Sequence, residues 1–328
     1  MSVKGDKAVD IAVSVIVPVF NGADTIIRCI NSIAEQTLEN IEIIVVDDGS
    51  EDNTAELVRD FCDARIHIIS QENSGQGFAR NTGLDSAKGK YIAFADADDT
   101  MEKDMLKEMF ERAEKTGADM VQCNICDVFL DGRRVTQLKP IDKTMDITNT
   151  VKYADIYFAR CRHSYEVCNK MINREFFVKS GVRFCDTRKY FSEDLMFNMC
   201  LLKYLRRISF ISESYYNYYQ HSGSHFHSDA EQRCKKIYGL FYDYMTNEDN
   251  TENLMSYTAA MVILFNLGFC IETDTARQII EDKFFRKCVK DALFRRCSVK
   301  HRIFLTAVYL LPLREKLKLI GKYSTRWT

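Results

Sequence analysis

Residues 13–19 have the sequence VSVIVPV, an unbroken apolar run in which β-branched side chains dominate. Such a run is typical of a strand that is buried on both faces of a parallel sheet. Residues 23–36 follow with isoleucines at helical spacing, and residues 41–46 form a second run of the first kind. This order of strand, helix and strand predicts a parallel sheet with crossover helices.

The same alternation continues to the end of the first hundred residues. We expect helices at 53–61 and 77–87 and strands at 66–69 and 91–95. The sequence therefore predicts an α/β fold, with a mostly parallel sheet and helices on both of its faces. Further expected elements are a helix at 103–116, a strand at 120–130, a helix at 191–205, a Tyr-rich extended segment at 214–220 and a helical region from 228 onward.

Composition excludes several classes of protein. The chain has 328 residues, of which 46% are hydrophobic and 28% charged, too apolar a mixture for a disordered protein. It contains no apolar run of about 20 residues, which excludes a transmembrane helix. Residues 1–10 have no apolar core, so we expect a flexible tail rather than a signal peptide. Twelve scattered cysteines without such a signal favour reduced thiols and a cytoplasmic location.

Charge is distributed unevenly along the chain. Residues 283–328 contain thirteen Lys or Arg and two acids, a net charge of +11, whereas the remaining residues carry −13. Aromatic and aliphatic residues alternate with the basic ones. Two interpretations remain open: an amphipathic segment lying on an anionic membrane surface, or a packed helical domain with a solvated basic face. Nucleic-acid binding is not expected, because no recognised motif accompanies the charge.

Polar residues follow three of the first four strands, at the carboxyl ends where ligands bind in open parallel sheets. Asp96 and Asp98 stand two residues apart at a strand end, so they share a face. Hard carboxylate oxygens at this spacing suit Mg²⁺ or Mn²⁺ bound to a substrate diphosphate. The adjacent Asp99 points the other way, and we expect it to cap the following helix or charge its first turn.

The loops after the second and third strands offer groups that recognise a nucleotide. Asp48 is placed to accept a hydrogen bond from the N3–H group of uracil. Backbone N–H groups at the helix start near residues 75–77 are suited to bind an anion. Arg80 is either a partner for phosphate or ribose, or a member of a surface ion pair.

Five motifs in order resemble the family 2 inverting glycosyltransferases with the GT-A fold. The resemblance covers residues 11–225. The motifs are VSVIVPVFNG at 13–22, VVDDGSEDNT at 45–54, NSGQGFARNTG at 73–83, FADADD at 94–99 and the Glu-Asp pair within SEDL at 192–195.

The resemblance implies a nucleotide-diphosphate sugar donor, most often a UDP-sugar, and Mn²⁺ or Mg²⁺ as cofactor. It implies that Asp98 binds the metal ion with Asp96, and that Asp194 of the Glu193-Asp194 pair is the catalytic base. His221 and Ser224 lie where relatives carry a loop that contacts the donor diphosphate; an ordinary solvated loop is the alternative. The full expected set for the donor and its nucleotide is Pro18, Phe20, Asn21, Asp48, Asn73, Gly75, Arg80, Asp96, His221 and Ser224.

The sequence thus predicts metal-dependent, inverting transfer of a single sugar to a glycan or lipid-linked acceptor in cell-surface polysaccharide biosynthesis. We expect a catalytic domain at residues 11–227, divided into a nucleotide-sugar half at 11–100 and an acceptor half at 101–227, and a helical region at 228–328. A lipid-linked acceptor would place the protein at the inner face of the cell membrane. The alternatives are a catalytically idle binding protein of the same fold and, less favoured, a sugar-phosphate nucleotidylyltransferase, which would need a basic triphosphate loop after its first strand.

Overall fold

A computed structural model describes residues 11–138, 140–148, 153, 164–190, 192–220, 230–247, 252–293 and 299–324. The chain divides into two compact units. The first consists of Met1–Thr148, Ser164–Thr187 and Glu193–His221, and the second of Asn149–His163, Arg188–Ser192 and Ser222–Thr328.

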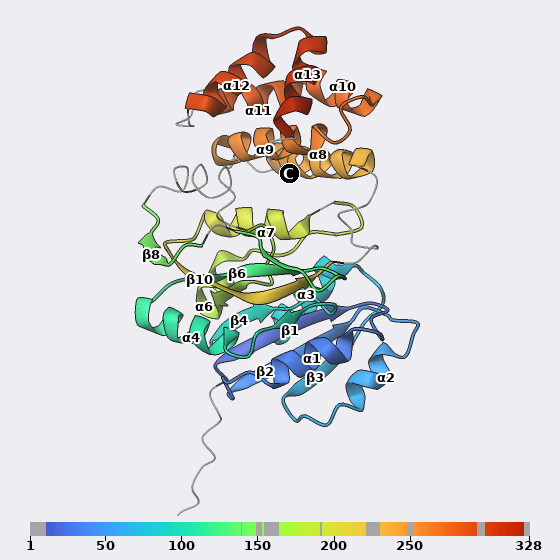
Figure 1. The fold of residues 1–328 in the computed structure, drawn as a ribbon, viewed down its shortest axis with the longest axis vertical. Helices are drawn as coiled ribbons and strands as arrows, with labels where there is room; N and C mark the ends of the chain where they lie inside the picture. Colours follow the sequence, from blue (N-terminus) through green and yellow to red (C-terminus); the bar gives the residue numbers. More distant parts are fainter. Residues whose placement is uncertain are drawn as a thin grey trace, which may run out of the picture. The chain divides into compact units, whose positions relative to one another are not determined.

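The first unit is built on a mixed sheet of ten strands among the described residues (Figure 1). The main path of the sheet has the order β3-β2-β1-β4-β9-β6-β10-β5. Its first four strands are parallel, β9 is antiparallel to both of its neighbours, and β10 is parallel to β6. The strands are β1 (Val13–Val19), β2 (Ile41–Asp47), β3 (Ile66–Ser70), β4 (Tyr91–Phe94), β5 (Thr100–Met101), β6 (Met120–Val128), β7 (Arg134–Thr136), β8 (Lys143–Asp146), β9 (Lys170–Asn173) and β10 (Arg207–Tyr219).

Helices cover both faces of this sheet, as the buried runs of β1 and β2 require. The helices of the first unit are α1 (Ile26–Ala34), α2 (Thr54–Arg59), α3 (Gln76–Ser86), α4 (Met105–Thr116), α6 (Arg174–Ser180) and α7 (Glu193–Leu202). Val15 and Val17 of β1 belong to a core that includes α1 and α4. Ile16 points to the opposite face and contacts α3 so closely that a Cβ atom on Gly83 would lie 2.4 Å from its Cγ2. Glycine at 83 therefore brings α3 close to the sheet.

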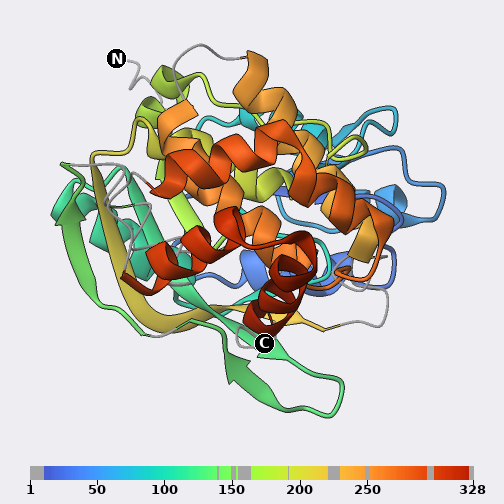
Figure 2. The same cartoon turned by 90° about the horizontal axis from the view of Figure 1, so that it is seen from above.

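The second unit is helical (Figures 1 and 2, orange to red). Its helices α8 (Ala230–Asn247), α9 (Glu252–Leu267), α10 (Asp274–Glu281), α11 (Lys283–Leu293), α12 (Val299–Leu310) and α13 (Leu313–Ser324) pack chiefly around α9. Phe285, Leu305 and Ile320 of the basic segment are buried. The segment therefore packs as helices, while Ile303 and Leu310 of α12 stay exposed. Among the residues with a described position, no helix is long and apolar enough to cross a membrane.

The expected elements match the structure within a few residues. The sequence did not predict strands β5, β7, β8 and β9 or helix α6, and of these β9 lies inside the sheet, between β4 and β6. The Tyr-rich segment is the end of a longer strand, β10. Residues 188–192 belong to the second, helical unit. There Lys189 Nζ and the Tyr190 hydroxyl donate to Asp243 Oδ2 of α8 at 2.8 and 2.6 Å. The expected limit at residue 227 lies near the last division between the units, at 221–222.

Candidate active site

The loops that follow β1 and β2 are joined by hydrogen bonds. The Asn21 backbone N–H donates to Ser50 Oγ at 2.9 Å, and the Asn21 side-chain oxygen accepts from the Glu51 N–H at 2.8 Å. Asn21 has a φ of 50°, a left-handed conformation that asparagine tolerates better than most residues. Pro18 pairs with Val46 within the sheet. The neighbouring Phe20 is 48% exposed, so its ring is accessible at the carboxyl end of the sheet.

Asp48 holds the loop that leads into α3. Its Oδ1 atom accepts from Gln71 Nε2 at 2.7 Å and from the Ser74 N–H at 2.9 Å. Its Oδ2 atom accepts from the Gly75 N–H at 2.7 Å, and Gly75 has a φ of 91° that favours glycine. This buried carboxylate thus orders the exposed Asn73 loop. Its contact with a nucleobase stays a prediction.

Two of the backbone N–H groups at the start of α3, those of Gly75 and Gly77, bind oxygen atoms of the protein. The Gly75 N–H is bound by Asp48, and the Gly77 N–H donates to Thr187 Oγ1 at 2.7 Å. A Cβ atom at Gly77 would lie 2.3 Å from the Cys185 carbonyl oxygen, so this contact also needs glycine. The expectation that these two groups bind an anion is therefore not met: they bind protein oxygens.

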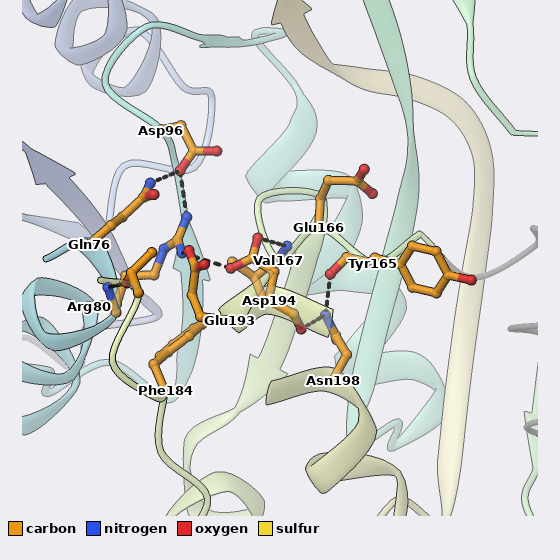
Figure 3. Close-up of polar contacts among 12 residues, drawn as sticks. Gln76, Arg80, Asp96, Tyr165, Glu166, Val167, Phe184, Glu193, Asp194 and Asn198 are labelled. Carbon is orange, nitrogen blue, oxygen red and sulfur yellow. Dashed lines mark hydrogen bonds and ion pairs between the residues drawn. The ribbon is translucent and has the colours of Figure 1, made fainter. Parts of the chain in front are cut away.

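Arg80 of α3 is the centre of the site (Figure 3). Its Nη1 atom lies 2.7 Å from Glu193 Oε1 and 2.7 Å from Asp194 Oδ1, and its Nη2 atom lies 2.7 Å from Asp96 Oδ1. Asp96 follows β4, whereas Glu193 and Asp194 begin α7. The Arg80 side chain is 2% exposed, which excludes the surface ion pair. One buried guanidinium thus joins two motifs that are about a hundred residues apart in the sequence.

Three carboxylates around one guanidinium leave the cluster with excess negative charge. Burial alone would lower the pKa of Arg80, but Asp194, Asp96 and Glu193 hold it above its ordinary value. Burial raises the pKa of Asp194 to about 8; Arg80 opposes this shift, and Glu193 and Asp96 add to it. Asp194 is thereby suited to accept and release a proton near neutral pH.

Two groups that the sequence analysis missed hold Asp194 in place. The Val167 N–H donates to Asp194 Oδ2 at 3.2 Å. Asn198 Nδ2 donates to the Asp194 carbonyl at 3.0 Å and to the Tyr165 carbonyl at 2.7 Å (Figure 3). Asn198 stands one helical turn after Asp194, a spacing that would have indicated it. No local pattern indicates Val167, because only its backbone takes part.

The turn that carries Asp96 and Asp98 is held by hydrogen bonds to strand β10. The Asp96 N–H donates to the Tyr216 hydroxyl at 3.0 Å. Asp99 is fully buried and accepts from the Tyr219 N–H at 2.9 Å. The expectation that Asp99 caps the next helix is wrong, since Asp104 occupies the N-cap position of α4. Burial, together with the negative charges of Asp98 and Asp96, raises the pKa of Asp99.

Asp96 and Asp98 fit a hard divalent cation. Both are carboxylates, and their negative charges add to burial in raising the pKa values of two buried neighbours, Asp99 and Cys29. Within the described ranges no group of three or more His, Cys, Asp or Glu residues is arranged to hold a metal ion. Mg²⁺ or Mn²⁺ would therefore take its other ligands from water and a diphosphate, as is usual for such sites.

The first turns of α3 connect the parts of the site. The Gly75 N–H donates to Asp48, and Gln76 Nε2 donates to Asp96 Oδ1 at 3.1 Å. One turn further along, Arg80 binds Glu193 and Asp194. His221 and Ser224 lie outside the described residues.

Sequence comparisons identify the family of this chain and several relatives. The model of the family described as "Glycosyl transferase family 2" matches residues 14–182. The uncharacterized glycosyltransferase EpsJ of Bacillus subtilis is 34% identical over 218 residues, which are 65% of this chain and 62% of EpsJ. The succinoglycan biosynthesis protein ExoO of Rhizobium meliloti is 35% identical over 182 residues, which are 55% of this chain and 52% of ExoO. The chain thus spans less than two thirds of these relatives.

Solved structures share the fold. TarS residues 1–349 of S. aureus, in complex with UDP-GlcNAc, superposes with a TM-score of 0.70 at 21% identity, covering 96% of this chain and 92% of that one. The mannosyltransferase PcManGT of Pyrobaculum calidifontis, in complex with GDP-Man and Mn²⁺, gives a TM-score of 0.54 at 17% identity over 95% of this chain and 86% of that one. The first unit has the expected GT-A fold, and the chain belongs to glycosyltransferase family 2.

Proposed function

We propose that this protein transfers a single sugar, with inversion and with the help of a divalent metal ion, from a nucleotide-diphosphate sugar to a hydroxyl group. The observation that carries the proposal is the convergence of Asp96, Glu193 and Asp194 on Arg80, each at 2.7 Å. It brings a diphosphate-binding motif and a carboxylate with a raised pKa to one place. The UDP-GlcNAc complex of TarS supports a UDP-sugar donor, and the role of ExoO supports a glycan or lipid-linked acceptor in polysaccharide biosynthesis.

In the proposed reaction Asp194 takes the proton of the acceptor hydroxyl as its oxygen attacks the anomeric carbon. The bond from that carbon to the diphosphate breaks in the same step, so one base suffices and the configuration inverts. Arg80 orients Asp194 and Asp96 toward one another. Asp98 and the remaining oxygen of Asp96 would hold Mn²⁺ or Mg²⁺, which offsets the charge of the leaving diphosphate.

We assign donor binding to the carboxyl ends of β1, β2 and β3. Phe20 offers an exposed ring, and Asp48 and Gly75 fix the loop on which Asn73 lies. His221 and Ser224 stay part of the proposal as contacts to the diphosphate. Glu193, which is buried against Arg80, is assigned to holding the guanidinium rather than to proton transfer.

Asp98→Ala is expected to abolish the dependence of transfer on Mn²⁺ and to slow nucleotide release by about 100-fold, because several kcal/mol of charge stabilisation depend on the bound cation. The measurement is nucleotide release from UDP-, GDP- and dTDP-sugars, first screened by thermal stabilisation with Mn²⁺. Asp85→Ala on the exposed side of α3 is the matched control and should behave as the wild type. If Asp98→Ala and the wild type release nucleotide at equal rates, Asp98 does not bind a catalytic metal ion. If the wild type binds a nucleotide sugar but releases no nucleotide from it, an idle binding protein is favoured instead.

We further propose that the protein works in the cytoplasm at an anionic membrane surface. Ile303 and Leu310 are 66% and 71% exposed and stand seven residues apart on α12, so they share one face of a basic helix. Replacing both by Ser should reduce co-sedimentation with phosphatidylglycerol vesicles by at least about half, because both side chains would enter the lipid interface. Val178→Ser, at an equally exposed position on α6, should not. Unchanged vesicle binding by the double variant would favour a solvated basic face.

A further inference from the structure

Lys170 is a buried cation to which the proposed reaction gives no role. It is the first residue of β9, in the interior of the sheet, and it is fully buried. Burying an ammonium group is costly unless hydrogen bonds and nearby charges compensate for the lost water. The burial of the Lys170 ammonium group therefore needs an explanation beyond packing.

The Lys170 ammonium binds the chain segment immediately before it. Its Nζ atom lies 3.0 Å from the Ser164 carbonyl, 2.9 Å from Ser164 Oγ and 3.0 Å from Asn169 Oδ1, and it also donates to the Glu166 carbonyl. Asn169 Nδ2 in turn donates to the Cys123 carbonyl of β6 at 2.7 Å. The ammonium therefore draws the turn at 164–167 together and fastens it to the sheet.

The other side of this turn faces the proposed base. The Val167 N–H donates to Asp194 Oδ2, and the Tyr165 carbonyl accepts from Asn198, which also binds the Asp194 carbonyl (Figure 3). Asp194 is thus held by Arg80 on one side and by the 164–167 turn on the other. The position of the turn depends on Lys170, since three of its four acceptors are atoms of Ser164 and Glu166.

The charged and titratable groups that act on Lys170 are Glu166, Cys168, Asp194 and Cys123. Burial lowers the pKa of Lys170 to about 8, and these four groups oppose the shift. A cation here also lowers the energy of the ionised form of Asp194.

We propose that Lys170 is a positioning residue, which holds the 164–167 turn so that the Val167 N–H orients the Asp194 carboxylate for proton transfer. This inference rests on the proposed role of Asp194 as the base. It predicts that loss of the ammonium slows the chemical step and leaves nucleotide binding intact, because the described hydrogen bonds of Lys170 go to Ser164, Glu166 and Asn169 and not to the loops after β1, β2 and β3.

The first test is Lys170→Met, which keeps an unbranched apolar side chain of nearly the same length and removes the ammonium group. With UDP-GlcNAc and Mn²⁺ as the probe, kcat for UDP release should fall by at least about 10-fold. The reason is that a displaced Asp194 carboxylate is no longer aligned with the hydroxyl group whose proton it takes. UDP affinity measured by calorimetry should stay within about two-fold of the wild type, and the pH of half-maximal rate should rise. Lys179→Met, at an exposed position on α6, is the control and should change none of these. An unchanged kcat, or equal losses of kcat and UDP affinity, would overturn the proposal.

The second test does not depend on activity. Thermal unfolding of Lys170→Met, Asp194→Asn and the double variant should show non-additive shifts in Tm, by about 2 °C or more, since the turn couples the two sites. Additive shifts in Tm would refute the coupling between Lys170 and Asp194, even if the protein transfers a sugar. By contrast, a wild type that releases no nucleotide from any sugar donor would refute the proposed function. Should Lys170→Met fail to fold, Ser164→Ala, which removes one acceptor, takes its place: a kcat several-fold below that of the wild type supports the proposal, and an unchanged kcat excludes it.

Discussion

Asp194→Asn is expected to lower kcat for sugar transfer by about 10³-fold while nucleotide affinity stays within a few-fold of the wild type. An amide cannot take the proton of the acceptor hydroxyl, and positioned bases contribute between 10² and 10⁴ in rate. The nucleotide is assigned to the loops after β1, β2 and β3, and among the described residues Asp194 is linked to this region through Arg80, which also binds Asp96. Transfer kinetics and calorimetry with the nucleotide separate the two quantities.

Glu193→Gln is the matched comparison, because Glu193 stands next to Asp194 and binds the same Nη1 atom. Glu193→Gln should lower kcat by about 10-fold or less, since it removes only one of the three carboxylates around the guanidinium. The wild-type rate should rise with pH up to about 8, where Asp194 loses its proton, and then level off. If Glu193→Gln lost more activity than Asp194→Asn, the two residues would have to exchange roles.

The first half of the fold follows from local sequence. The runs at Val13–Val19 and Ile41–Asp47 are apolar on both faces and lead into amphipathic helices, so each strand and its crossover are specified by neighbouring residues. Strand β9 is different. It has four residues, begins with a lysine, and becomes an inner strand only because β4 and β6 lie on either side of it. No periodicity over four residues predicts such an insertion.

In the candidate site, too, some residues are indicated by local sequence and others only by tertiary packing. Asp96, Asp98, Glu193 and Asp194 are indicated by motifs in which the residues stand next to each other. The partnership of Arg80 with Glu193 spans 113 residues and is created by packing α3 and α7 on one face of the sheet, which the sequence does not show. For the same reason the occupied N–H groups of Gly75 and Gly77 were misjudged: their acceptors, Asp48 and Thr187, come from other segments.

Arg80→Met is expected to destabilise the protein by about 3–5 kcal/mol near pH 8 and to abolish transfer. Removing the guanidinium leaves three carboxylates facing each other with little water, and breaking a buried ion pair from one side has costs of this size. Arg80 opposes the raised pKa of Asp194, so without the cation this pKa in the folded state rises further above that in the unfolded state. Stability is therefore retained at low pH, where Asp194 is protonated, and is lost as the pH rises through the folded-state pKa of Asp194. Chemical denaturation at pH 5.5 and pH 8 should thus give a smaller deficit at the lower pH.

Arg65→Met is the control for this prediction. Arg65 also binds a carboxylate closely, with its Nη2 atom 2.6 Å from Asp63 Oδ2, but its side chain is 30% exposed and its partner is a single acid. Pairs of this kind contribute about 1 kcal/mol or less, so the variant should unfold near the wild type at both pH values. A deficit for Arg80→Met that is independent of pH would mean that lost packing, rather than three unpaired carboxylates, is responsible. In that case Arg80 fills space between α3 and α7, and the raised pKa of Asp194 has to come from burial alone.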